Sequence, residues 1–255
     1  MKLKNILSVA MLAGATLAAG AGVANAEVTL SGNVALTTDY LFRGLSQTQH
    51  APAIQGGFDL SAGQFYAGTW ASNIDFGSAG PLSVNTPMEL DVYAGFKPTI
   101  GPISADFGVI GYLYPGADDN GLLASGEFNY YELKAAGSIT PAAGFTLGAA
   151  AYFSPEFPGN GGNSWYTELN AAYTVSDSLA ISGAVGHQTV DTSGYFVTTG
   201  GSEDAYTTWN VGATYSTHGF GIDLRYVGNS VDDITNIVGE TVSDNTVVLT
   251  LKRAL

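Results

Sequence analysis

The sequence predicts an all-β fold, a transmembrane antiparallel up-and-down β-barrel of about 12 strands with short periplasmic turns and long extracellular loops. Three observations lead to this prediction. Apolar and polar residues alternate with period two along a dozen segments, as in strands with one apolar face. The connections between these segments alternate between short and long. Beyond residue 26 there is no apolar run of about 18 residues, so no spanning helix is expected.

The N-terminal stretch has the order of a cleaved secretory signal peptide. Two lysines precede an apolar run that begins at Ile6, and small residues frame a cleavage site between Ala26 and Glu27. A transmembrane helix is the alternative, but the run is short for one. We therefore expect a signal peptide over 1–26 and one barrel domain over 27–255.

The expected mature chain is acidic but poor in charge. It keeps six basic and 22 acidic residues, a difference of −16, so we expect it to repel nucleic acid. Charged residues make up 12% of the sequence, about half the share in soluble domains. The 14 Tyr, 12 Phe and 3 Trp give a surface that suits lipid better than water. There is no cysteine, so no disulfide holds the fold.

Each expected strand is about ten residues long, enough for a tilted strand to cross a bilayer. The clearest pair lies within 164–190, where two alternating segments flank a tight turn. The twelve expected strands span residues 28–42, 53–61, 64–76, 88–98, 103–114, 128–139, 145–154, 164–175, 178–190, 205–216, 219–229 and 244–254.

The connections between the expected strands fall into two classes that alternate along the chain. A soluble sandwich would more often have connections of mixed length. In an outer-membrane barrel, the short turns lie on the periplasmic side. The expected short turns are 62–63, 101–102, 140–144, 176–177 and 217–218. The expected long loops are 44–52, 77–87, 115–127, 155–163, 191–204 and 230–243.

Ionisable residues lie on the strand face opposite the apolar row. Along 88–98, for example, Leu90 and Val92 alternate with Glu89 and Asp91. A basic residue on the lipid face at mid-depth costs about 2–4 kcal/mol, so we place the ionisable residues in the lumen. The predicted pore-lining residues are Asp39, Arg43, Asp59, Glu89, Asp91, Lys97, Asp106, Glu132, Lys134, Glu168, Asp223 and Arg225.

Aromatic residues complicate the assignment of faces. In segment 64–76 they occupy both phases, and we assign Tyr66, Trp70, Ile74 and Phe76 to the outer face. Aromatic residues near segment ends suggest an interfacial girdle, although aromatics also favour strands in general. The expected girdle residues are Tyr40, Phe42, Tyr152, Phe153, Trp165, Tyr215, Phe220 and Tyr226.

Two states of the lumen are compatible with this pattern. Acidic groups around a pore favour cations, which predicts a weakly cation-favouring channel. Alternatively, opposite charges on neighbouring strands could pair and plug a narrow barrel, because twelve strands lies between filled small barrels and open porins of about sixteen. Loops can also fold inward, and the Gly-rich stretch Pro158–Asn163 is our candidate for such a constriction.

A set of spaced residues near the N-terminus of the expected barrel matches a known pattern. These residues are Asp39, Tyr40, Arg43, Gly44, Ser46, Gln47, Pro52, Gln55, Gly56, Tyr66, Gly68, Trp70, Ser72 and Asn73. The stretch 37–76 resembles the start of the TorF family of porins, proteobacterial barrels formerly of unknown function. The resemblance implies a channel in the outer membrane of a Gram-negative bacterium, with no defined substrate and no established functional residue.

One feature departs from outer-membrane barrels as a class. Such chains commonly end in an aromatic residue, whereas this one ends in Leu255 with Arg253 in the same phase. This weakens the expected signal to the barrel-assembly machinery. The other expected partners are outer-membrane lipid, lipopolysaccharide and small polar solutes.

The predicted function is passive diffusion of small polar solutes, without a cofactor or catalysis. The first alternative is a non-conducting barrel that is structural or binds a partner. The second is a barrel hydrolase, for which His187 near Thr189 or His50 beside Thr48 would supply the base. Asp118–Gly121 resembles a fragment of a calcium loop, but it lacks the later Glu and we interpret it as a turn.

Overall fold

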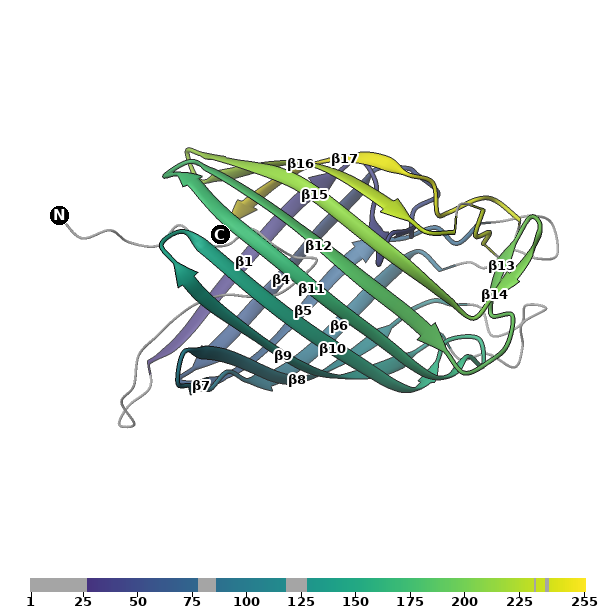
Figure 1. Ribbon diagram of the computed structural model, residues 1–255, viewed down its shortest axis with the longest axis horizontal. Helices are drawn as coiled ribbons and strands as arrows, with labels where there is room; N and C mark the ends of the chain where they lie inside the picture. Colours follow the sequence, from purple (N-terminus) through teal and green to yellow (C-terminus); the bar gives the residue numbers. More distant parts are fainter. Residues whose placement is uncertain (1–26, 78–85, 118–127, 232, 237–238) are drawn as a thin grey trace.

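The computed structural model describes residues 27–77, 86–117, 128–231, 233–236 and 239–255. Its main sheet has 13 strands, of which the two-residue β7 (Thr99–Ile100) pairs only with β8. The other twelve form a closed antiparallel barrel (Figure 1). They are β1 (Val28–Thr37), β4 (Ala53–Ala62), β5 (Phe65–Asn73), β6 (Met88–Phe96), β8 (Ile103–Leu113), β9 (Tyr130–Ala142), β10 (Phe145–Phe157), β11 (Gly162–Ser176), β12 (Leu179–Val190), β15 (Ala205–Thr217), β16 (Phe220–Asn229) and β17 (Thr246–Ala254).

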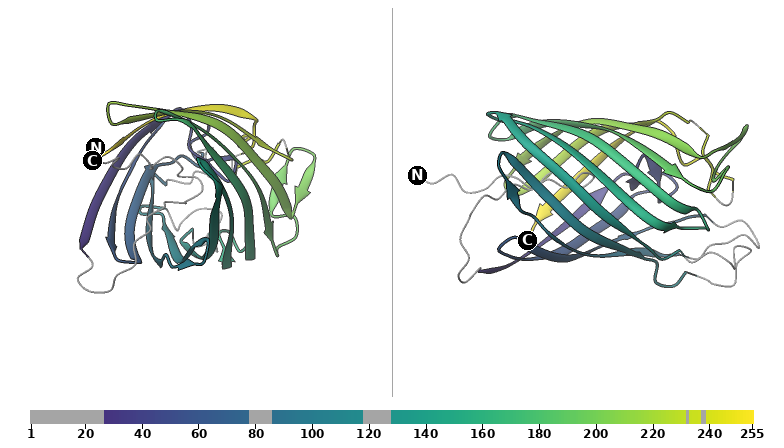
Figure 2. Two further views of the ribbon diagram at one scale, coloured as in Figure 1. Left: turned by 60° about the vertical axis from the view of Figure 1, so that its left-hand side comes forward. Right: turned by 60° about the horizontal axis from the view of Figure 1, so that its bottom comes forward.

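Every strand of the barrel is paired on both edges. Neighbours in sequence are neighbours in space, and the first strand β1 closes the ring by pairing with the last strand β17, with Asn33 opposite Ala254. Figure 2 shows the strands tilted around a common interior. Because closure removes all sheet edges, the barrel satisfies its backbone hydrogen bonds without help from solvent. The predicted up-and-down barrel of twelve strands is confirmed.

The outer face of the barrel is apolar, as predicted. Large apolar side chains that alternate along the strands are strongly exposed, including Leu30 at 72% and Leu169 at 69%. On β6, Val92 is exposed while its neighbour Glu89 is buried. This alternation is what strands with a lipid-facing side require.

The two ends of the barrel differ in their connections. Tight turns join the strands at one end, at the left of Figure 1, and longer connections lie at the other. The small ribbon of β13 (Phe196–Thr198) and β14 (Gly201–Glu203) belongs to the long-loop end. One expected loop is shorter than predicted, because β10 and β11 extend further and leave only 158–161 between them. The Gly-rich stretch that we expected to fold inward is the tip of this hairpin.

The N-terminal expected strand, 28–42, ends earlier than predicted. β1 stops at Thr37, and the chain then turns into the barrel. The first connection, 38–52, contains the short strands β2 (Leu41–Phe42) and β3 (Leu45–Ser46), which pair as a hairpin. We call residues 38–52 the inward hairpin. The alternating run Asp39 to Phe42 reads as strand, but it belongs to this hairpin rather than to the wall.

Several aromatic residues point inward, contrary to prediction. Tyr66 donates to Asp106 inside the barrel, Trp70 packs on Tyr40, and Ile74 is buried. Phe65, which is 64% exposed, instead begins the outward-facing row of side chains on β5. The reason is that tyrosine and tryptophan fill the lumen here, so aromatic character alone does not mark the lipid side.

The predicted girdle is confirmed only in part. Tyr40, Phe42 and Tyr152 belong to the interior, where Phe42 and Tyr152 flank Arg43. By contrast, the outer surface carries Trp165, Tyr215, Phe220 and Tyr226, which are all exposed.

Two predictions fall outside the part of the chain that the structure describes. They are the signal peptide over 1–26 and the turn at Asp118–Gly121. Among the described residues, there is no helix with the length and apolar character needed to cross a membrane.

Candidate functional site: the lumen and its inward hairpin

The inward hairpin is held in shape by its own polar groups. The carboxylate of Asp39 accepts hydrogen bonds from the hydroxyls of Ser46 at 2.7 Å and Thr48 at 2.9 Å. The Nδ1 atom of His50 lies 3.0 Å from the same carboxylate. Asp39 and Thr48 are buried, so these bonds satisfy groups that have little access to water. The hairpin is therefore a folded unit rather than a loose loop.

The tip of the inward hairpin is the two-residue turn Arg43–Gly44. Both residues have positive φ, 49° and 80°, the geometry of the tight turns that join twisted strands. Glycine suits its position because a Cβ there would lie 2.5 Å from the Thr208 hydroxyl of β15. The turn thus presents the Arg43 side chain to the far wall of the barrel.

Arg43 makes the hairpin's strongest contacts. Its Nη2 donates to Glu132 of β9 at 2.6 Å, and its Nη1 donates to Gln188 of β12 at 2.8 Å. The guanidinium also lies 4.3 Å from the ring centre of Tyr166 and 5.3 Å from that of Tyr152. Arg43 is only 6% exposed and Glu132 only 1%, so this is a buried ion pair.

The environment keeps Arg43 charged. Burial by itself lowers the pKa of Arg43, but the carboxylate of Glu132 and the neighbouring tyrosines raise it by more, so the net pKa is raised. Burial, together with Glu89, raises the pKa of the Tyr40 hydroxyl, which therefore stays protonated and donates its hydrogen bond. The hairpin thus brings one fixed positive charge into the lumen.

The inward hairpin touches the barrel wall on all sides. Tyr40 donates to Glu89 of β6 at 2.5 Å, and Phe42 packs edge-on against Tyr112 of β8. On the opposite side, Leu41 packs with Val227 of β16 and Val248 of β17, and Asn229 donates to the carbonyl of Gly44 at 2.6 Å. With Arg43 on β9 and β12, the hairpin crosses the lumen from β1 to the wall opposite.

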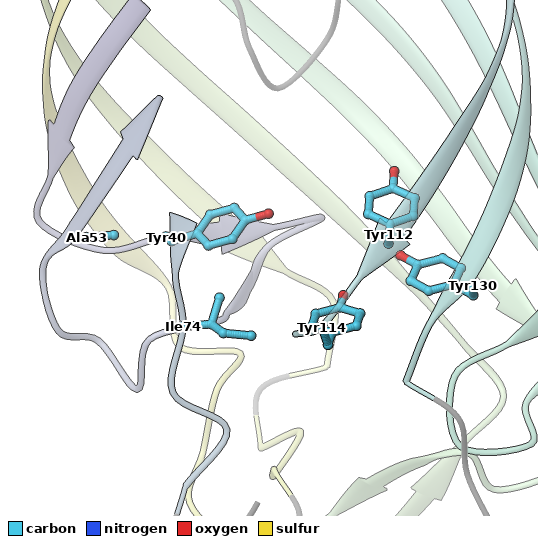
Figure 3. Packing of buried hydrophobic residues seen from close by; sticks show 6 residues of the cluster. All are labelled: Tyr40, Ala53, Ile74, Tyr112, Tyr114 and Tyr130. Carbon is cyan, nitrogen blue, oxygen red and sulfur yellow. The ribbon is translucent and has the colours of Figure 1, made fainter. Parts of the chain in front are cut away.

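A layer of tyrosines surrounds the hairpin. Tyr112 and Tyr130 stack with ring centres 4.4 Å apart, and Tyr114 donates to Glu89 at 2.8 Å. Figure 3 shows these three rings and that of Tyr40 inside the barrel, between its walls. The layer is buried, so this level of the lumen is packed with side chains.

Toward the short-turn end, the lumen carries ion pairs on the wall. Lys134 of β9 pairs with Asp106 of β8 at 2.7 Å. Arg225 pairs with Asp223 on the same strand, at 3.1 Å, and donates to Ser182 of β12. The first pair joins neighbouring strands and the second lies within β16, so neither crosses the lumen as the plugged alternative expected.

The remaining acids are held by neutral groups. Among the described residues, Glu89 accepts from two tyrosines, Asp59 accepts from Tyr93, and Glu168 accepts from Tyr166 and an asparagine. One oxygen of Asp91 is buried without a hydrogen-bond partner. After pairing with the bases, the interior therefore retains an excess of acidic groups.

The structure places the twelve predicted site residues in three groups. Nine of them lie on the inner phase of barrel strands. Asp39 and Arg43 lie on the inward hairpin instead of a strand. Lys97 lies in the turn after β6, with its ammonium 4.2 Å from the ring centre of Tyr66. The nine strand residues are Asp59, Glu89, Asp91, Asp106, Glu132, Lys134, Glu168, Asp223 and Arg225.

Sequence reasoning missed several groups in the lumen. Gln188, which anchors Arg43, is 1% exposed, and Lys252 lies half-buried on the inner phase of β17. Lys252 could have been found, because it alternates with the outward Leu251 and Arg253. Gln188 and the tyrosine layer could not have been found in this way, because a neutral polar or aromatic side chain does not indicate whether it faces the lumen or the outside.

In the described part of the chain, neither histidine named for a hydrolase is hydrogen-bonded to the threonine named beside it. The Nε2 atom of His50 lies 3.1 Å from the carbonyl of Thr241, and the Thr48 hydroxyl already donates to Asp39. His187 is exposed on the outer face, with Nδ1 3.0 Å from the hydroxyl of Thr207. Within the described ranges, no group of three or more potential metal ligands is assembled.

Comparison with solved structures supports the fold. The NanC porin superposes with a TM-score of 0.54 at 10% identity, covering 89% of this chain and 98% of the porin. A structure from work on the in-meso crystallisation of membrane proteins gives a TM-score of 0.50 at 9% identity, covering 88% and 83%.

The sequence itself was compared with curated proteins and with family models. No curated protein matches the chain. The model of one family, described as bacterial protein of unknown function, matches residues 21–255. The chain therefore belongs to the Gcw_chp family.

Proposed function

We propose that the protein is an outer-membrane porin for the passive diffusion of small polar solutes, with a weak preference for cations. One observation carries the proposal. The closed barrel has an apolar outer face, and its inner face carries acidic or basic side chains from seven strands, β4, β6, β8, β9, β11, β16 and β17. An exterior of this kind suits lipid, and an interior lined by charged groups from so many strands suits the passage of polar solutes.

The mechanism requires no cofactor. Polar side chains in the lumen replace part of the hydration shell of a passing solute, and the net charge of the lumen biases which solutes enter. The lumen residues described above are eight acids and five bases, so the bias is toward cations. The inward hairpin limits passage to small species.

A second candidate is a non-conducting barrel that is structural or binds a partner. The observation in its favour is the inward hairpin, which contacts the wall from β6 through β9 and β12 to β17. In small barrels, side chains that fill the lumen leave no path.

Single-channel conductance separates the two candidates. The mature protein, refolded and inserted in a planar bilayer, is expected to give small, stable current steps, and a salt gradient should give a reversal potential of cation-selective sign. Folding is checked by the heat-dependent shift in electrophoretic mobility that intact barrels show. A folded barrel that gives no steps would contradict the porin proposal and favour the structural barrel.

Further proposals accompany this function. We place the short turns in the periplasm and the long loops outside the cell, and we expect cleavage of residues 1–26 after export. Lipid, lipopolysaccharide and the barrel-assembly machinery are the partners expected of such a protein. The resemblance of 37–76 to the TorF family of porins is consistent with the proposal at the level of the family.

A further inference from the structure

We infer that Arg43 is the positioning residue that holds the inward hairpin across the lumen, and that it thereby sets both the open cross-section and the charge selectivity of the pore. The inference rests on the proposed function and deepens it. The inward hairpin obstructs the lumen, and Arg43 binds its tip to β9 and β12 on the far side of the barrel.

Arg43 binds two separate strands of the barrel wall. Glu132 and Gln188 lie on β9 and β12, which β10 and β11 separate, and one guanidinium binds both. Tyr152 and Tyr166, from the two intervening strands, place their rings against it. A planar guanidinium can donate in two directions while its face stacks on aromatic rings, which an ammonium cannot do.

The base of the hairpin is fixed independently. Ser46 donates its backbone N–H to the carbonyl of Val242 at 2.8 Å, and Asp75 donates its own to that of Gln47. His50 lies between Asp39 and Thr241. Because none of these contacts involves Arg43, the base should stay in place when Arg43 is lost. The tip should then leave the β9–β12 side of the wall and keep its bond from Asn229 to the Gly44 carbonyl.

Arg43 also affects the charge of the lumen. Arg43 forms its ion pair with Glu132, which interacts electrostatically with Asp91, while Arg43 itself interacts with Glu168. Removing Arg43 therefore exposes a further carboxylate to the solute path. A freed tip widens the path, and an unpaired Glu132 makes it more favourable to cations.

The test measures unitary conductance and reversal potential for three variants beside the wild type. Arg43→Gln should raise the conductance roughly twofold or more, because the path is wider, and should shift the reversal potential toward cation selectivity. The double variant Arg43→Gln/Glu132→Gln should keep the larger conductance and lose the extra selectivity. Arg43→Lys, which retains the charge but not the two-directional bonding, should have intermediate conductance.

A matched control changes the same charge away from the lumen. Arg253 is exposed on the outer phase of β17, with its guanidinium 4.6 Å from the ring centre of Phe220. Arg253→Gln should leave conductance and reversal potential at the wild-type values. If it changed them as Arg43→Gln does, the inference would be overturned.

The outcomes are distinguishable from failure of the proposed function. If the wild type conducts and the folded Arg43 variants match it in conductance and selectivity, the inference is wrong while the porin proposal stands. A silent wild type with a conducting Arg43→Gln variant supports the inference. If every folded form is silent, both are wrong. Should Arg43→Gln fail to fold, Arg43→Lys and the double variant decide: a conductance equal to that of the wild type in both overturns the inference.

Discussion

At the scale of single residues, the lumen separates two kinds of buried acid. Glu132 and Asp106 each have a basic partner, and removing either acid leaves the basic residue without its ion-pair partner. Among the described contacts, Asp91 has no basic partner, and one of its oxygens is buried without a hydrogen bond. A buried carboxyl without partners is unfavourable for folding, so Asp91 should contribute little to stability or oppose it.

For the paired type, we predict a large loss of stability on substitution. Glu132→Ala leaves the Arg43 guanidinium buried and unpaired, which should lower the free energy of unfolding by about 3–5 kcal/mol. Urea titration of the barrel in detergent or lipid vesicles measures it. Glu203→Ala, at an exposed site on β14, is the control and should change the midpoint little. A midpoint for Glu132→Ala equal to that of the control would show that the ion pair does not stabilise the fold.

For the acid without a basic partner, we expect substitution to have the opposite effect on the free energy of unfolding. Asp91→Asn replaces a buried carboxyl near Glu89 and Glu132 with a neutral amide of similar size, so the urea midpoint should stay the same or rise. Asp106→Asn serves as the comparison, because it loses the contact with Lys134 and should lower the midpoint. A clear loss of stability in Asp91→Asn would mean that this acid has a partner after all.

At the scale of elements, the inward hairpin depends on close packing between its tip and the wall. Tyr166 of β11 stacks on Arg43, and its ring lies directly over Gly186 of β12. A Cβ at Gly186 would meet the Tyr166 ring and hydroxyl at less than normal contact distance. Position 186 thus needs a glycine, because the ring of Tyr166 on the neighbouring strand occupies the space of a side chain.

We therefore expect Gly186→Ala to displace Tyr166. The unfolding free energy should fall by about 1–3 kcal/mol, the usual cost of overpacking. Gly200→Ala is the matched control, since a Cβ there meets nothing within 4 Å. The measurement is again the urea midpoint, and equal midpoints for the two variants would refute the packing argument.

The inward hairpin also marks the limit of prediction from the sequence. The ten-residue strands were predictable because a lipid-facing row must alternate with a polar row, as Val92 does with Glu89. Asp39 to Phe42 alternate in the same way, yet they turn inward, because their partners lie far along the chain. Arg43 binds Glu132 and Gln188 across 89 and 145 residues, and no local pattern reports such contacts. Tyr66 and Trp70 were misassigned for a related reason, since an aromatic ring suits either face.

At the scale of the whole molecule, the outer apolar surface is what the barrel requires of its surroundings. Exposed Leu, Val, Ile and aromatic side chains lie on all twelve barrel strands or at their ends. In water such a surface would drive aggregation, whereas in a bilayer it is matched by lipid chains.

A charge placed on this surface should cost energy according to its depth. Leu169 lies in the middle of β11 and is 69% exposed, so Leu169→Arg should lower the stability in lipid vesicles by about 2–4 kcal/mol. Val175→Arg, near the short-turn end of the same strand, should cost about 0–1 kcal/mol. Equal losses at the two depths would argue against a membrane-embedded wall.

The closure of the barrel between β1 and β17 affects the order in which the protein folds. The inward hairpin follows β1 directly in the chain, but its partners lie on β9, β12, β16 and β17. Its contacts with Glu89 of β6 and Tyr112 of β8 need only the first half of the chain, but these later partners need nearly all of it, and contacts so distant in sequence make folding slow. Ring closure and capture of the hairpin are therefore late events, and a barrel whose last strand has docked already has its obstruction inside.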